Sequence, residues 1–194
     1  MTAQKTGRLD AQIAFLKEAD QLKSVLRASR LIDNSRFENS AEHSWHIMLY
    51  VMVLADQAGS DVQINRVLKM LLLHDIVEID AGDAPIHGNF DHAAVAAKEI
   101  AAADRLFGLL PDDQEAEFRA LWDEFEAAKT PDAQFAKAVD RMQVPIANLA
   151  NGGGSWVDYK VTLDQLDTRV GVPIKRGAPG VWAWLRPQLV AFFN

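Results

Sequence analysis

The sequence predicts an all-α fold, a single domain over residues 1–194 built as a bundle of about seven or eight helices. Apolar residues recur at helical spacing in most segments, as at Ile13 and Leu16 near the start of the chain. Residues that favour helix starts and helix ends separate these segments. No run of useful length alternates between apolar and polar residues, as a half-buried β-strand would. These observations together favour packed helices without a sheet.

The first predicted helix covers about residues 9–29, where charged residues lie between the apolar positions. Three arginines, Arg27, Arg30 and Arg36, cluster near the turn that follows.

Two further helices follow before the middle of the chain. Asn39 and Glu42 form a predicted capping box, which starts a helix that continues to about Ala58. A residue of the Ser60-Asp61 pair is expected to cap the next helix, which runs to about Ile79. The most informative stretch of the sequence lies at the end of that third helix.

The second half of the chain opens with a loop over residues 81–90, which contains two glycines, a proline and an asparagine. Helices are predicted at about 91–107, at 111–129 and from 130 onward, and Pro145 is expected to kink or end the last of these. The Gly152-Gly153-Gly154 run predicts a flexible loop, with shorter helices near 163–168 and 179–193.

Composition excludes several classes of protein. The chain has no cysteine, which excludes disulfides and thiolate zinc sites. Its net charge of −7 argues against a protein that coats the phosphates of a nucleic acid polymer. No apolar run approaches the length of a membrane span, and the first twelve residues contain no apolar signal region. A cytoplasmic protein that binds neither membranes nor nucleic acid polymers is therefore expected.

The stretch from Leu71 to Asp83 places ionisable residues inside an apolar run. His74 and Asp75 point about 100° apart on a helix, so both can reach one ion between neighbouring helices. Glu78 shares their face, four residues after the histidine and three after the aspartate. Burying an imidazole and carboxylates among leucines and valines is unfavourable unless they bind a metal or hydrogen-bond one another.

Two further residues on predicted helices, His43 and Asp140, join His74 and Asp75 as candidate metal ligands, which makes four. Two imidazoles and two carboxylates suit one divalent ion such as Co, Mn, Fe, Ni, Zn or Mg better than Ca, and do not choose among these metals. Four protein ligands leave two positions of an octahedral ion for a water and a substrate oxygen. Glu78 lies one turn along, where it could take a proton from that water.

Four segments in this order resemble the HD superfamily of metal-dependent phosphohydrolases, in particular its branch of 5′-deoxynucleotidases. The segments are Glu38-Asn39-Ser40-Ala41-Glu42-His43-Ser44-Trp45-His46, His74-Asp75-Ile76-Val77-Glu78-Ile79, Gly82-Asp83 and Val139-Asp140-Arg141. The resemblance implies one divalent metal held by His43, His74, Asp75 and Asp140, with Glu78 and Asp83 as catalytic carboxylates. It also implies that Arg27 holds the phosphate, with Arg30 and Arg36 as competitors for that role.

The expected activity is hydrolysis of a deoxynucleoside 5′-monophosphate. Few cations are visible near the site in the sequence, which favours one phosphate over a triphosphate. Another small phosphate ester or phosphodiester, or a non-catalytic regulator that binds a metal or nucleotide, remains the alternative. His87 and His92 could add a second metal, but five residues across a Gly-Asn loop is poor helical spacing.

The apolar C-terminal segment over residues 181–193 predicts a homodimer or a higher oligomer, because it has more large apolar groups than a short helix can bury alone.

Overall fold

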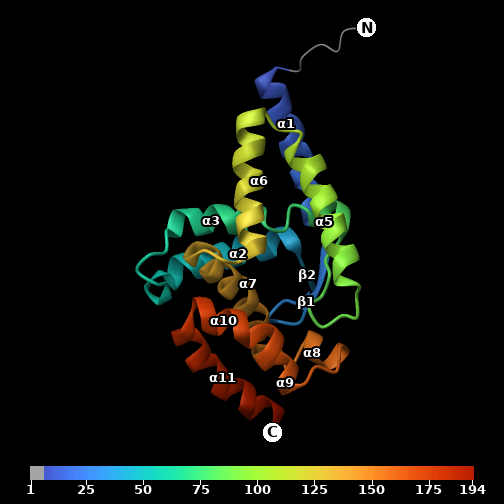
Figure 1. Cartoon of the computed structure of the whole chain (residues 1–194). Helices are drawn as coiled ribbons and strands as arrows, with labels where there is room; N and C mark the ends of the chain where they lie inside the picture. Colours follow the sequence, from blue (N-terminus) through green and yellow to red (C-terminus); the bar gives the residue numbers. More distant parts are fainter. Residues whose placement is uncertain (1–6) are drawn as a thin grey trace.

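Helices make up most of the molecule, which is long in one direction and has a single short hairpin among its described residues (Figure 1). The computed structural model describes residues 7–194. The first six residues, part of the N-terminal stretch without an apolar signal region, lie outside this range. The all-α prediction is confirmed, while the single domain over 1–194 stays a prediction. Within residues 7–194, each helix is too short or too polar to cross a bilayer.

The elements follow one another in a simple order. The first half contains α1 (Arg8–Ala19), a 3₁₀ turn (Asp20–Ser24), β1 (Leu26–Arg30), β2 (Phe37–Asn39), α2 (Ser40–Val53), a second 3₁₀ turn (Ala55–Gln57), α3 (Ile64–Leu73) and α4 (Glu78–Ala81). The second half contains α5 (His92–Phe107), α6 (Asp112–Ala127), α7 (Pro131–Ala150), α8 (Ser155–Asp158), α9 (Leu163–Gln165), a π-helical segment (Leu166–Gly171), α10 (Val172–Gly177) and α11 (Pro179–Phe193). The last third of the chain is therefore divided into more and shorter helical segments than the sequence indicated.

The prediction of a helix over 9–29 is wrong at its C-terminal end. The helix ends at Ala19, and β1 pairs antiparallel with β2 in a register that joins Leu26 to Asn39 and Arg30 to Phe37, with an irregularity between them. Strands of five and three residues are too short to show alternation in the sequence. Tertiary contacts of the polar residues in β1 outweigh local helix propensity here.

The third predicted helix also differs from the expectation. It begins after Gln63, whose N–H donates to Asp132 Oδ1 on α7 at 2.6 Å, so a distant carboxylate replaces the expected Ser60-Asp61 cap. It ends at Leu73 rather than Ile79, and i to i−3 hydrogen bonds tighten the turn that follows. This turn separates α3 from α4 and carries the His-Asp pair.

The predicted helix starts at Asn39 and Thr130 are confirmed. Asn39 and Glu42 form a capping box at the start of α2, and the Thr130 hydroxyl accepts from Ala133 N at the start of α7. Pro145 does not end α7, which continues to Ala150. These two helices position the candidate site, because α2 carries His43 and α7 carries Asp140.

Two apolar clusters meet at the His-Asp turn. One cluster joins α2, α3, α7 and the C-terminal helices, and it includes Leu71 and Leu73. The other joins α1, α5 and Trp122 of α6 in the narrow end of Figure 1, and it includes Ile76 and Val77. The turn between them is therefore anchored on both sides by buried side chains.

The C-terminal helix α11 buries more of its apolar surface than the sequence indicated. Val181, Leu185 and Leu189 belong to the larger cluster, whereas Trp184 remains 57% exposed. The segment therefore gives less support to an oligomer than expected, because much of it is satisfied within the chain.

Candidate metal centre

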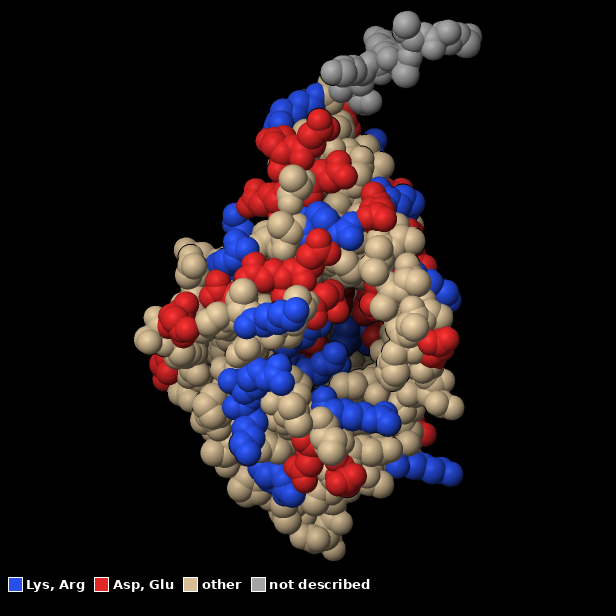
Figure 2. All heavy atoms as spheres, in the orientation of Figure 1, with Lys and Arg blue, Asp and Glu red and all other residues tan. Residues whose placement is uncertain are grey.

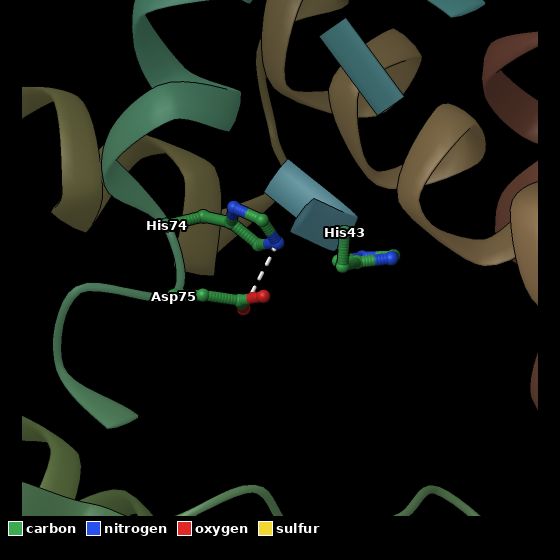
Figure 3. A group of neighbouring side chains, drawn as sticks. All are labelled: His43, His74 and Asp75. Carbon is green, nitrogen blue, oxygen red and sulfur yellow. Dashed lines mark ion pairs between the residues drawn. The ribbon is translucent and has the colours of Figure 1, made fainter. Parts of the chain in front are cut away.

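Three elements bring the four candidate ligands together. His74 and Asp75 lie in the turn after α3, His43 projects from α2, and Asp140 projects from α7. His74 Nε2 lies 2.9 Å from Asp75 Oδ1 and 3.9 Å from Asp140 Oδ1, and His43 Nε2 lies 3.2 Å from Asp140 Oδ1. His43, His74 and Asp75 each offer an atom within 4.8 Å of the others' atoms. Figure 3 shows these three buried side chains and the His74–Asp75 contact.

The backbone fixes which nitrogen of His74 faces the centre. Its Nδ1 lies 2.8 Å from the carbonyl oxygen of Leu71, so this nitrogen carries the proton and donates it. Nε2 is then a lone-pair atom that faces the carboxylate of Asp75. Within residues 7–194, this buried Nε2 has no hydrogen-bond partner. Two acceptor atoms this close need either a proton or a metal ion between them.

His43 is completely buried and has a carboxylate on each side. Its Nε2 faces Asp140 and its Nδ1 faces Glu38 Oε2 at 3.4 Å. Burial and the Arg27 charge lower the pKa of His43, but the contacts with Asp140 and Glu38 outweigh them and raise it to about 9. Both ring nitrogens are therefore protonated at neutral pH, and the ring is positively charged, until another cation takes the place of the second proton.

This donor set fits a divalent ion. Ligands bonded at about 2.0–2.2 Å lie about 3–4 Å apart around one ion, which is the range of the nitrogen–oxygen distances at this centre. Burial raises the pKa of Asp140, but the positive charge of Arg141 and the contact with His43 outweigh it and hold that pKa well below its ordinary value. Burial likewise opposes ionisation of Asp75, and the contacts with His74 and Arg27 lower its pKa to about 2. Ionised carboxylates and lone-pair nitrogens are the forms that bind metal.

Glu78 begins α4, on the rim of this centre. Its Oε2 accepts a hydrogen bond from the Ser40 hydroxyl at 2.5 Å, which ties α4 to the start of α2. Burial, followed by repulsion from Asp75, raises the pKa of Glu78 to about 9. A carboxyl group that can hold a proton at neutral pH is suited to general acid–base chemistry.

Asp83 lies beside the same rim, after a turn that Gly82 makes with a φ of 77°. Its Oδ2 accepts from the backbone N–H of Ala28 at 3.2 Å, so it anchors β1 next to Arg27. Burial raises the pKa of Asp83. The second predicted catalytic carboxyl therefore faces the same pocket as the first.

Arg27 is the predicted phosphate-binding residue that the structure places at the centre. Its guanidinium lies 3.0 Å from Asp75 Oδ2 and 4.0 Å from Glu78 Oε1. The competing arginines point elsewhere: Arg30 lies over the Phe37 ring, and Arg36 pairs with Glu42. The strand β1 explains this separation, because it turns Arg27 inward to the carboxylates.

A pocket opens from this centre, and Figure 2 shows a hollow in this part of the surface with both charge signs at its edge. Its wall includes Lys137 and Arg141, one turn apart on α7, which the sequence analysis did not assign. The pocket therefore holds two cations besides Arg27, and its wall, as formed by residues 7–194, has no cluster of lysines. Lys137 pairs with Glu126 at 2.9 Å, and Arg141 Nε lies 3.5 Å from Asp140 Oδ2. Lys137 lies three residues before Asp140 and Arg141 one residue after it, and this closeness to a candidate ligand could have identified both residues from the sequence.

His87 lines the pocket, and His92 is exposed at the start of α5. Neither belongs to the cluster of potential metal ligands within residues 7–194. The geometry therefore gives no support to a second metal at this pair.

Comparisons with known proteins agree with this geometry. Curated proteins named 5′-deoxynucleotidase HDDC2 from Danio rerio and Homo sapiens are each 28% identical to this chain. The alignments cover 71% and 68% of this chain, and 68% and 64% of those proteins. The alignments thus span about two thirds of the relatives' length.

A solved structure and a family comparison point the same way. The crystal structure of a predicted metal-dependent phosphohydrolase from Magnetospirillum magnetotacticum is 47% identical, with a TM-score of 0.90 and 95% of each chain covered. A conserved hypothetical protein from Pyrococcus furiosus shares the fold at 21% identity, with a TM-score of 0.64. The HD domain family matches residues 19–182. The chain belongs to the HD domain family.

Proposed function

We propose that this chain is a metal-dependent phosphohydrolase that converts deoxynucleoside 5′-monophosphates to deoxynucleosides and phosphate. The observation that carries the proposal is the convergence of His43, His74, Asp75 and Asp140 beside the carboxyl groups of Glu78 and Asp83. A non-catalytic metal site would need the first four side chains alone. The 5′-deoxynucleotidase names of the curated relatives support the substrate class.

The four convergent side chains would hold one divalent ion, whose identity among Co, Mn, Fe, Ni, Zn and Mg is open. Such an ion supplies positive charge that polarises a phosphoryl oxygen, lowers the pKa of a water and offsets the repulsion between Asp75 and Glu78. Arg27 adds two N–H donors for phosphate oxygens. The buried walls around these groups strengthen each electrostatic contact.

Two carboxyl groups divide the proton transfers. Glu78, held by the Ser40 hydroxyl, would take a proton from the attacking water once a bound metal ion offsets its repulsion from Asp75 and leaves it ionised. Asp83, which accepts from the backbone N–H of Ala28 next to Arg27, would give a proton to the leaving 5′-oxygen. Burial raises the pKa values of both groups, which favours the protonated form that Asp83 needs as a general acid.

The charge balance of the pocket favours one phosphate. The wall carries the carboxylates Asp75, Glu78, Asp83, Glu99, Glu126 and Asp140, and the cations Arg27, Lys137 and Arg141. Lys137 already neutralises Glu126, so little positive charge remains for a second and third phosphate.

Phosphate release from deoxynucleoside monophosphates, ribonucleoside monophosphates and deoxynucleoside triphosphates, each with several divalent metals, tests the proposal. Deoxynucleoside monophosphates should be hydrolysed fastest, and His74→Ala should remove metal binding and activity together. Triphosphate hydrolysis at equal or higher rates would overturn the substrate assignment. Metal binding without hydrolysis of any substrate would identify a regulator instead.

We also propose a homodimer. The support is an exposed apolar face on α2, formed by Trp45, Leu49, Met52 and Val53, with Trp184 of α11 nearby in the same groove wall as Leu49 and Val53. Large exposed apolar faces favour association. Light scattering at micromolar concentration should give twice the chain mass, and a monomer mass would contradict the proposal. The cytoplasmic location stays a prediction.

A further inference from the structure

Glu38 is a buried carboxylate behind the metal centre, with no role in the chemistry described above. It lies on β2 and is 3% exposed. Its Oε1 accepts from Gln143 Nε2 on α7 at 3.0 Å, and its Oε2 accepts from the Ser29 hydroxyl on β1 at 3.0 Å. Burying an ionised carboxylate is unfavourable, so a position this enclosed requires compensating partners.

Two further groups face this carboxylate from the functional side. His43 Nδ1 lies 3.4 Å and Arg27 Nε lies 3.6 Å from Glu38 Oε2. Both nitrogens are buried and, in the described part of the chain, have no hydrogen-bond partner. A movement of about half an ångström would bring each within hydrogen-bond distance of the same oxygen.

We propose that Glu38 is a positioning residue that sets the metal ligand His43 and the phosphate-binding Arg27 at the same time. It holds the proton of His43 on Nδ1, which leaves the Nε2 lone pair facing the centre. It also holds the Nε–H of Arg27, which directs the outer guanidinium nitrogens toward Asp75 and the bound phosphate. The inference rests on the proposed function.

The general chemistry of such sites supports this assignment. A histidine that binds metal donates its other N–H to a carboxylate or carbonyl, which fixes the ring and increases its basicity. Leu71 supplies that acceptor for His74, and Glu38 is placed to supply it for His43. Glu38 differs from the Leu71 carbonyl because it also faces Arg27, so its loss should affect metal affinity and substrate affinity together.

The test compares Glu38→Gln with Asp132→Asn in the full-length, chelator-treated protein. Glutamine keeps the size of Glu38 but removes the negative charge that His43 and Arg27 face, and it replaces one acceptor oxygen with an N–H donor group. Asp132 is a matched control, because it is a buried carboxylate that accepts from Gln63 N, near the start of α7 and outside the pocket wall. Both variants are titrated with Mn²⁺ by calorimetry, melted with and without Mn²⁺, and assayed with thymidine 5′-monophosphate.

Glu38→Gln should weaken Mn²⁺ binding about 10- to 100-fold and raise KM for the nucleotide. Asp132→Asn should melt at lower temperature yet bind Mn²⁺ with near wild-type affinity.

Wild-type Mn²⁺ affinity and KM in Glu38→Gln would overturn the inference while leaving the proposed function intact. If Glu38→Gln does not fold, Glu38→Asp, which keeps the charge but shortens the reach, should show the same two losses, and its wild-type behaviour would be equally decisive. If the wild-type protein binds none of Mn²⁺, Co²⁺, Fe²⁺, Ni²⁺, Zn²⁺ and Mg²⁺, the proposed function is overturned, and the inference with it.

Discussion

At the scale of single residues, the candidate ligands could be found from the sequence because each is a polar residue inside an apolar helical pattern. His74 and Asp75 could be placed on one ion from adjacency alone, and the structure brings His43 and Asp140 to them. Arg141 was not assigned, because its place in the pocket depends on how α7 rotates against the centre. The roles of these residues stay predictions that substitutions can test.

Glu78→Ala should separate chemistry from metal binding. The Ser40 hydroxyl holds this side chain at the rim of the cluster, so metal content should remain near normal. Turnover should fall about 10²- to 10⁴-fold, the range for a lost acid–base group. Metal analysis and steady-state kinetics measure the two effects. Asp80→Ala, in the same helix but paired with Arg105, is the control and should retain turnover. Parallel loss of metal would make Glu78 a ligand.

Arg27→Ala should lower kcat/KM about ten- to hundredfold for every base alike, because it removes charge-assisted contacts with the phosphate. Arg30→Ala is the matched control, because Arg30 lies on the same strand but stacks over the Phe37 ring and away from the pocket. Kinetics with several deoxynucleoside monophosphates compare the two variants. A larger loss in Arg30→Ala would move the phosphate contact to that residue.

At the scale of elements, the sequence predicted the helix starts correctly where the capping residue and the N–H group it binds lie within one turn of each other. The capping box at Asn39 and the Thr130 cap depend on residues within one turn, so the sequence contains the whole interaction. The hairpin and the end of α3 depend on distant partners instead. Ala28 of β1 donates to Asp83, and the start of α3 donates to Asp132, and neither contact can be seen from the neighbouring sequence.

Gly177→Ala should destabilise the packing of α10 on α7. An added Cβ at this position would lie 2.1 Å from the backbone carbonyl oxygen of Gln134, which cannot move away freely. We expect a loss of about 1–3 kcal/mol in the free energy of unfolding, measured by urea denaturation. At the exposed Gly180, an added Cβ would meet only the end of the Gln57 side chain, so Gly180→Ala should be nearly neutral. Equal stability of the two variants would contradict the close contact.

At the scale of the whole molecule, the site lies where two apolar clusters meet, so the two clusters set its geometry together. The sequence predicted the helices that form each cluster but not their division, because helical periodicity shows which face is buried and not against which partner. Leu73 and Ile76 belong to different clusters although only two residues separate them. Loops that join the clusters should therefore influence global stability, and the loop of residues 82–91 offers a test.

His87 in this loop should make the protein less stable as pH falls. Burial, followed by the charges of Arg169 and Arg141, lowers the pKa of His87 to about 4, and Arg169 also binds the adjacent carbonyl of Ile86 at 3.0 Å. The unfolded chain takes up the proton near the ordinary pKa of about 6.5. Between these values the unfolded state binds more protons, so stability is full above the unfolded pKa and is lost as pH falls toward 4.

Urea denaturation of the wild-type protein and of His87→Gln, at about pH 7 and about pH 5, measures this effect as a difference of differences. Glutamine cannot take up the proton, so the stability advantage of the wild-type protein over His87→Gln should shrink as pH falls. His92→Gln, at the exposed start of α5, controls for the loss of a histidine. A difference between wild type and His87→Gln that does not change with pH would show that His87 is hydrated and accepts its proton freely in the folded protein. The loop would then be looser against α7 and the π-helical segment than the contact of Arg169 with Ile86 indicates.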